Sequence, residues 1–217
     1  MGFISELYEW NLKREIQKNN VPEHIVLALA ESDLLADNNY SSLKSFIIWC
    51  NETGINIVTI YIGMIEVDAQ LSQKISEKLL LELPAVLNDI TSNINVITRW
   101  DREITNNGIE GMTVNISIGY SGKYELTRAI KEIMKDVEKK NLDPGDINEK
   151  VIESHLRFKS EPDIVIRAGG KRLTDFLIWQ SVYSELYFTD VNWLDFRKVD
   201  FLRVIRDYQK RQRRFGK

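Results

Sequence analysis

Charged and glycine residues near the C-terminal end of the chain are suited to binding a phosphate group. The apolar residues 164–166 predict a buried strand of a parallel sheet, and Arg167 and Gly169 follow at its carboxyl end. Open α/β sheets bind their ligands at that edge. Arg167 and Arg172 bracket the glycine turn, and their planar, permanently charged guanidinium groups fit phosphate oxygens. Because Glu185 follows on the next segment, a metal-bound phosphate ester suits this set.

The alternative for the same charges is an ordinary surface arrangement. Arg167 and Arg172 would then pair with Asp175 and Glu185 as exposed ions beside a glycine turn. Arginine–carboxylate neighbours are common on protein surfaces and contribute little. The charges alone favour this alternative. The order of the residues around them is therefore needed to distinguish a phosphate site from surface ion pairs.

The order of residues 161–196 strongly resembles the C-terminal signature of the cis-prenyltransferases, the undecaprenyl diphosphate synthase family; it reads EPDIVIRAGGKRLTDFLIWQSVYSELYFTDVNWLDF. By this resemblance, Arg167, Arg172 and Thr174 bind isopentenyl diphosphate, and Glu185 is a Mg²⁺ ligand. The turn between the two arginines is one residue shorter than in relatives. The resemblance covers most of the chain, densely in the C-terminal part and patchily before it.

The first predicted strand, residues 25–30, departs from the family at its carboxyl end. Relatives carry there a Mg²⁺-binding aspartate in a D-G-N-G-R or D-G-N-R-R motif, whereas this chain has Ala30. A methyl group cannot ligate Mg²⁺, which needs hard oxygen donors. The acids Glu31, Asp33 and Asp37 could replace it only on a reshaped loop, and we prefer a solvated loop and a helix N-cap for them.

Three further segments compare unevenly with the family. Residues 63–68, GMIEVD, stand where relatives have F-S-x-E-N-W around the allylic substrate. Residues 120–125, YSGKYE, resemble Y-G-G-R-x-E, so Lys123 would offer phosphate a point charge without a bidentate fork. The family's terminal R-x-G is present at Arg214 and Gly216, and by the resemblance it crosses the dimer interface to support the diphosphate site of the neighbouring subunit. The alternative for this basic end is a solvated tail.

The elements that hold these residues follow from apolar periodicity, which predicts a single-domain α/β fold, residues 1–217, with a mainly parallel central sheet flanked by helices. Strands are predicted over residues 25–30, 55–62, 93–99, 113–120 and 164–166. Helices are predicted over residues 4–18, 41–54, 71–87, 129–137 and 196–217, the last with a basic tail, and Pro84 is expected to disturb the third of them. A short helix that reaches His155 is expected to begin at a capping-box pair, Asp146 and Glu149. Thr174 and Asp175 are expected to cap one more helix.

The N-terminal segment, within residues 1–20, reads as an amphipathic helix. Packing on its own domain is one interpretation, and peripheral contact with a membrane surface or a partner is the other. Acids as well as bases on its polar side count against a purely electrostatic membrane contact.

Composition limits the class of protein. The net charge of −3 and the pI of about 5.6 argue against nucleic-acid binding through bulk positive charge. The single cysteine, Cys50, excludes an intrachain disulfide and a cysteine-based zinc site, and we expect a reducing cytoplasm. Cys50, His24 and His155 are expected to be structural. No apolar run approaches the ~20 residues that span a bilayer.

Two segments bear on chain elongation. By the resemblance, the helix over residues 71–87 would line a tunnel for the growing prenyl chain, although simple core packing explains its apolar face equally well. Relatives that make long chains have an additional helix between residues 99 and 113. The shortness of that interval here argues against an independent elongation tunnel.

The sequence thus keeps one half of the family's site and lacks the other. We expect a subunit of a heteromeric cis-prenyltransferase, similar to the Nogo-B receptor type of partner, that lends Arg214 and Gly216 to a catalytic sister. The complex would condense isopentenyl diphosphate with an allylic prenyl diphosphate, with Mg²⁺, to give Z-polyprenyl diphosphate for polyprenol or dolichol-type carriers. The alternatives are a self-sufficient homodimeric short-chain enzyme and a non-catalytic protein that binds prenyl diphosphates.

Overall fold

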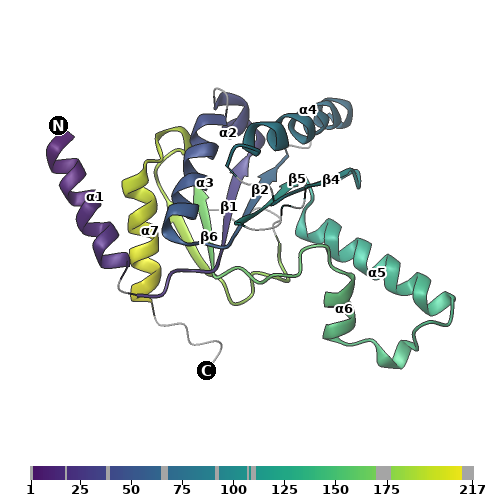
Figure 1. Cartoon of the computed structure of the whole chain (residues 1–217). Helices are drawn as coiled ribbons and strands as arrows, with labels where there is room; N and C mark the ends of the chain where they lie inside the picture. Colours follow the sequence, from purple (N-terminus) through teal and green to yellow (C-terminus); the bar gives the residue numbers. More distant parts are fainter. Residues whose placement is uncertain are drawn as a thin grey trace.

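A seven-stranded sheet forms the centre of the chain (Figure 1). The computed structural model describes residues 2–17, 19–37, 40–64, 68–90, 93–106, 108, 111–169 and 177–211. The strand order is β4-β3-β5-β2-β1-β6-β7, and every neighbouring pair is parallel except β3 with β4. The expected α/β fold around a mainly parallel sheet is therefore confirmed. Within the described ranges, no helix has the length and apolarity that a membrane span requires.

The elements match most of the predicted ones. The strands are β1 (His24–Ala30), β2 (Ile57–Gly63), β3 (Asn93–Thr98), β4 (Glu103–Asn106), β5 (Thr113–Ile118), β6 (Ile164–Ala168) and β7 (Glu185–Thr189). The α-helices are α1 (Gly2–Ile16), α2 (Glu31–Ala36), α3 (Ser41–Thr53), α4 (Ala69–Leu87), α5 (Gly122–Glu138), α6 (Glu149–His155) and α7 (Lys198–Lys210). Two short 3₁₀ helices are η2 (Pro144–Asp146) and η3 (Trp193–Asp195).

Strand β1 shows why the sheet is buried on both faces. Its alternate residues Ile25, Leu27 and Leu29 belong to the large core that the sheet shares with α2, α3, α4 and α7. Val26 and Ala28 point to the other face, where a smaller apolar cluster lies. A continuous apolar strand is the pattern expected when both faces of a parallel sheet are covered.

Helix α3 ends as its sequence predicts. Gly54 follows it with φ of 85°, a left-handed conformation that glycine adopts without strain, and its N–H caps the last turn. Phe46 on α3 is fully buried and meets Trp193 and Phe201 edge to face. These contacts fix α3 and α7 on the same side of the sheet.

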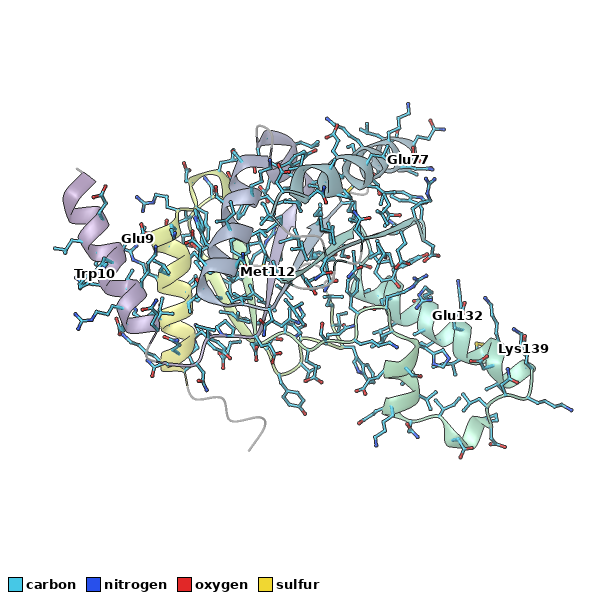
Figure 2. All side chains as sticks on the ribbon, viewed as in Figure 1. Glu9, Trp10, Glu77, Met112, Glu132 and Lys139 are labelled. Atoms are coloured by element: carbon cyan, nitrogen blue, oxygen red, sulfur yellow. The ribbon has the colours of Figure 1, made fainter. Side chains whose placement is uncertain are left out.

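Helix α1 packs along α7 at one side of the molecule (Figure 1). Leu12 and Ile16 are buried, so packing on the chain's own domain is confirmed for this face. Leu7 and Trp10 are about half exposed, and Trp10 lies on the outer side of α1 (Figure 2). A membrane contact of this outer side stays a prediction.

Helices α5 and α6 project from the body, away from α1 and α7 (Figure 1). The predicted capping box of Asp146 and Glu149 is wrong. Asn148 caps α6 instead, because its side-chain oxygen accepts a hydrogen bond from the N–H of Val151 at 3.2 Å.

Three other expectations need correction. Helix α4 runs through Pro84 to Leu87 without interruption. The interval between β3 and β5 contains the antiparallel strand β4, which the sequence did not predict. The predicted capping residues Thr174 and Asp175 lie outside the described residues, and residues 177–183, which do not form the helix expected there, are mostly turns.

Candidate functional site

The carboxyl ends of five strands bring the candidate residues together. Ala30 of β1 is level with Gly63 of β2, and Arg167 of β6 is level with Ala28. Arg99, which follows β3, donates its backbone N–H to the carbonyl of Ile118 at the end of β5, at 3.0 Å. This is the edge at which open α/β sheets bind ligands.

A cavity of about 560 Å³ lies at this edge. It is bounded by the ends of β1, β2 and β6, the residues after β3 and β5, and the first turns of α5. Its cationic lining residues, among those described, are Arg99, Lys123, Lys131 and Arg167. The lining also includes the phenol rings of Tyr61 and Tyr124. A concave site of this size with convergent cations suits a phosphorylated small molecule.

Gly119 allows the cavity wall to close. Its φ is 61°, and a β-carbon on it would lie 2.7 Å from Cγ of Met64, closer than real side chains approach. Glycine therefore lets Met64 pack against the turn between β5 and α5. Leu29 and Met64 give the cavity an apolar wall beside its cations.

Arg167 is the predicted residue that the structure places most clearly. It is half-buried, and its Nη1 donates to the carbonyl oxygen of Ala28 at 3.1 Å. Its Nε is buried and has no partner among the described residues. Because an unpaired buried donor costs about 1–3 kcal/mol, an acceptor oxygen supplied by a ligand would stabilise this arrangement.

Ala30, the residue that the resemblance places at the family's aspartate position, lines the cavity. Its N–H donates to Oδ2 of Asp33 at 2.8 Å. Asp37 is buried and accepts from the N–H groups of Ser42 and Leu43 at the start of α3, at 3.0 and 3.2 Å. Asp37 thus caps the first N–H groups of α3, although the N-cap position itself is Tyr40. The solvated loop expected for these acids is wrong, because Glu31 and Asp33 lie in helix α2 and Asp37 is buried.

Glu185 lies away from this cavity within one chain. It is the first residue of β7 and is level with Ile164, whereas Phe188 is level with Arg167. Three residues along a strand correspond to about 10 Å, toward the amino end. The Glu185 carboxylate instead pairs with Nη1 of Arg211 at 2.9 Å. Its role as a Mg²⁺ ligand stays a prediction.

The described residues do not fit Mg²⁺ at the cavity. No group of three or more histidine, cysteine, aspartate or glutamate side chains among them could hold a metal ion. Glu31, beside Ala30, has one buried carboxylate oxygen without a described partner, but it does not line the cavity. Mg²⁺ requires several oxygen ligands in near-octahedral geometry, and this lining offers cations instead.

Several predicted site residues lie outside the described residues; these are Arg172, Thr174, Arg214 and Gly216. Lys123, in contrast, lines the cavity as the sequence predicts. Arg99 and Lys131 were missed. Arg99 is the last residue of the predicted strand 93–99, so attention to the carboxyl ends of strands, which selected Arg167, would have found it. Lys131 could be found only from the orientation of α5.

Glu125, which follows Lys123 on α5, is structural. Its buried carboxylate accepts from the backbone N–H groups of Arg157 and Phe158 at 2.9 and 3.0 Å, and from Nε2 of Gln180 at 2.9 Å. Burial raises the pKa of Glu125, and these hydrogen bonds oppose the rise. These hydrogen bonds hold the start of α5, which carries Lys123, against the segments that contain Arg157 and Gln180.

The histidines and the cysteine are structural, as expected. His24 is buried, its Nε2 lies 2.8 Å from Oγ1 of Thr59, and burial lowers the pKa of His24 to about 4. His155 pairs with Asp136 at 3.0 Å. Cys50 is fully buried, which raises the pKa of its thiol and makes it unreactive.

The chain is similar to known proteins along its whole length. Residues 63–216 match a family model described as "Putative undecaprenyl diphosphate synthase". The chain is 32% identical over 251 residues to the tritrans,polycis-undecaprenyl-diphosphate synthase (geranylgeranyl-diphosphate specific) of Methanocaldococcus jannaschii, covering 99% of this chain and 89% of that protein. It is 34% identical over 250 residues to the enzyme of the same name from Picrophilus torridus, covering 99% of this chain and 98% of that protein.

A solved structure agrees on the fold. The crystal structure of lavandulyl diphosphate synthase from Lavandula x intermedia in complex with dimethylallyl diphosphate superposes with a TM-score of 0.71 at 23% identity, covering 91% of this chain and 99% of that one. The family model begins at residue 63, after the strand that ends in Ala30. The alignments are also longer than the 217 residues of this chain, so the relatives carry residues that it lacks.

Proposed function

Because this chain belongs to the undecaprenyl diphosphate synthase family, the cis-prenyltransferases, we propose that it condenses isopentenyl diphosphate with an allylic prenyl diphosphate. The cationic cavity at the carboxyl end of the sheet carries this proposal, since Arg167 and Lys123 bring positive charge to it. The names of the relatives support the same substrate class, because they describe synthases of a prenyl diphosphate.

The residues of the cavity are suited to assist ionisation of the allylic diphosphate. When the C–O bond of an allylic diphosphate breaks, negative charge develops on the leaving pyrophosphate. Cations that are already in place stabilise this charge with little reorganisation. Arg167 is held by its bond to Ala28, so its remaining donors are oriented before the substrate arrives. Leu29 and Met64 offer an apolar surface for the first isoprene unit.

We further propose that the chain works without a sister subunit, as a homodimer. Relatives that carry a single enzyme name align with 99% of the chain, which supports an enzyme without a second kind of subunit. The short connection through β4, where relatives that make long chains have an additional helix, favours a short product. The tail that carries Arg214 and Gly216 would then serve a second copy of the same chain.

The second candidate is the heteromeric subunit, and Ala30 is the observation that favours it. A catalytic sister with an aspartate at the equivalent position would supply the Mg²⁺ site that the described residues of this chain do not form. This chain would then contribute its C-terminal tail across the interface.

Substitution of Arg167 tests the proposed function. Arg167→Gln removes the charge but keeps a donor, and we expect it to lower kcat for isopentenyl transfer about 10²-fold, as for loss of one preorganised charge-stabilising group. Chromatography of labelled products from isopentenyl diphosphate and geranylgeranyl diphosphate gives the rate. Lys150→Gln, on exposed α6, is the matched loss of one charge and should leave the rate unchanged. Wild-type activity in Arg167→Gln would contradict the proposal.

A further inference from the structure

We propose that this cavity binds a substrate diphosphate with cationic side chains and without Mg²⁺, and that Arg99 is one of the binding residues. The identity of the ligand rests on the proposed function. The mode of binding rests on the charges and the donor set of the cavity itself.

The charged side chains that line the cavity are all positive among the described residues. Among the described residues, the cavity is lined by Arg99, Lys123, Lys131 and Arg167 and by no aspartate or glutamate. A diphosphate carries several negative charges, and in most binding sites a divalent metal shares them with the protein. Here side-chain cations are gathered where that metal would otherwise be needed.

These cations come from three separate parts of the fold. Arg167 is on β6, and Lys123 is in the first turn of α5, with Lys131 two turns further along. Arg99 follows β3 and is fixed by its backbone bond to Ile118. The amino end of the 17-residue helix α5 also lies at the cavity through Ser121, Lys123 and Tyr124, and its partial positive charge favours an anion. Arg167 adds a buried Nε without a described partner.

The described carboxylates around the cavity do not line it, although Glu31, beside Ala30, keeps one buried oxygen without a described partner. Asp101 accepts a hydrogen bond from the hydroxyl of Tyr124 at 3.3 Å. Asp33 accepts from the backbone of Ala30, and Asp37 caps α3. Glu185 is at the other end of the sheet, paired with Arg211. Because a metal-bridged diphosphate needs carboxylate oxygens on the protein side, Ala30 and the cations together indicate direct binding.

Calorimetric titration of the full-length chain with inorganic pyrophosphate tests this inference. We expect the same dissociation constant in EDTA and in Mg²⁺. Arg99→Gln should weaken binding about tenfold, as for loss of a charged hydrogen bond, while Arg102→Gln, which removes an exposed charge nearby that does not line the cavity, should bind as wild type. Binding that requires Mg²⁺, or wild-type affinity in Arg99→Gln, would overturn the inference.

A second variant tests the same point in the opposite direction. Ala30→Asp places a carboxylate at the cavity and keeps a residue that suits its helix N-cap position, so the fold should be retained. We expect weaker pyrophosphate binding in EDTA and recovery on addition of Mg²⁺. If this variant binds like wild type under both conditions, the anion does not lie against Ala30 and the inference fails.

The outcomes separate this inference from the proposed function. Metal-free pyrophosphate binding that depends on Arg99, with no isopentenyl transfer under any condition, would support the binding mode and reject the activity. Isopentenyl transfer with pyrophosphate binding only in Mg²⁺ would support the activity and reject the binding mode.

Discussion

Three residues of the cavity, Arg167, Lys123 and Ala30, were selected from the sequence. Arg167 was predicted from the strand before it, and it lies in the cavity with a fixed orientation. Lys123 was predicted from a shorter resemblance and lies there too. Ala30 also lines the cavity, and its equivalence to the family's aspartate stays a prediction.

His24 gives a prediction for stability against pH. Burial lowers its pKa in the folded chain to about 4, below the usual 6.5, so the unfolded chain binds the proton more readily between these values. Stability should therefore fall as the pH decreases from about 6.5 toward 4. By linkage, His24 should account for a loss of about 2–3 kcal/mol between pH 7 and pH 4.5.

Urea unfolding at both pH values measures this loss. His24→Gln keeps a polar side chain that can reach Thr59 and removes the titration, so its stability should fall by about 2–3 kcal/mol less than that of wild type over the same interval. Equal losses in the two proteins would show that His24 does not titrate as its burial indicates.

At the scale of elements, the start of α5 depends on Glu125. Glu125→Ala would leave the partly buried N–H groups of Arg157 and Phe158 without their acceptor and would remove one of the two acceptors of the Gln180 amide, and we expect it to cost about 2–4 kcal/mol. Thermal or urea unfolding followed by circular dichroism measures the cost.

The matched control is Glu132→Ala on the same helix. Glu132 pairs with Lys135 at an exposed position, so its removal should leave the stability close to that of wild type. Similar losses of stability for Glu125→Ala and Glu132→Ala would mean that the hydrogen bonds of Glu125 do not hold α5 in place.

The strands could be predicted because parallel strands are long apolar runs. Strands β1, β2, β5 and β6 all begin or end within two residues of their predicted limits. Strand β4 could not be predicted in the same way, because ITN after an exposed Glu103 has no apolar run. Contacts distant in sequence hold it: pairing with β3, the packing of Ile104 on the core and the ion pair of Glu103 with Arg157. The cap of α6 was misassigned since Asp146 and Asn148 are both good N-caps, and only backbone geometry distinguishes them.

The cavity was only partly predictable for a related reason. Periodicity places residues at the end of a strand, and this was enough for Arg167. Lys131 reaches the cavity from the second turn beyond Lys123 on α5, so its contribution depends on how that helix is oriented against the sheet. That orientation is set by distant contacts such as Glu125 with Gln180, which no local pattern reveals.

At the scale of the whole molecule, the two ends of the sheet carry different groups. The cationic cavity is at the carboxyl end, while Glu185 and Arg211, which precedes the tail, meet toward the amino end. We propose that a second chain completes a site that uses both sets. The proposed homodimer and the heteromeric alternative both provide such a chain, and they differ in whether the second chain must carry an aspartate where this one has Ala30.

Isopentenyl transfer by the purified chain alone, with and without EDTA, tests the central proposal most directly. We predict prenyl diphosphate product from the chain alone, formed by a homodimer and lost in Arg167→Gln. Product that forms only after co-expression with a relative bearing D-G-N-R-R, and that disappears with Arg214→Ala in this chain, would contradict self-sufficient catalysis and establish the heteromeric subunit.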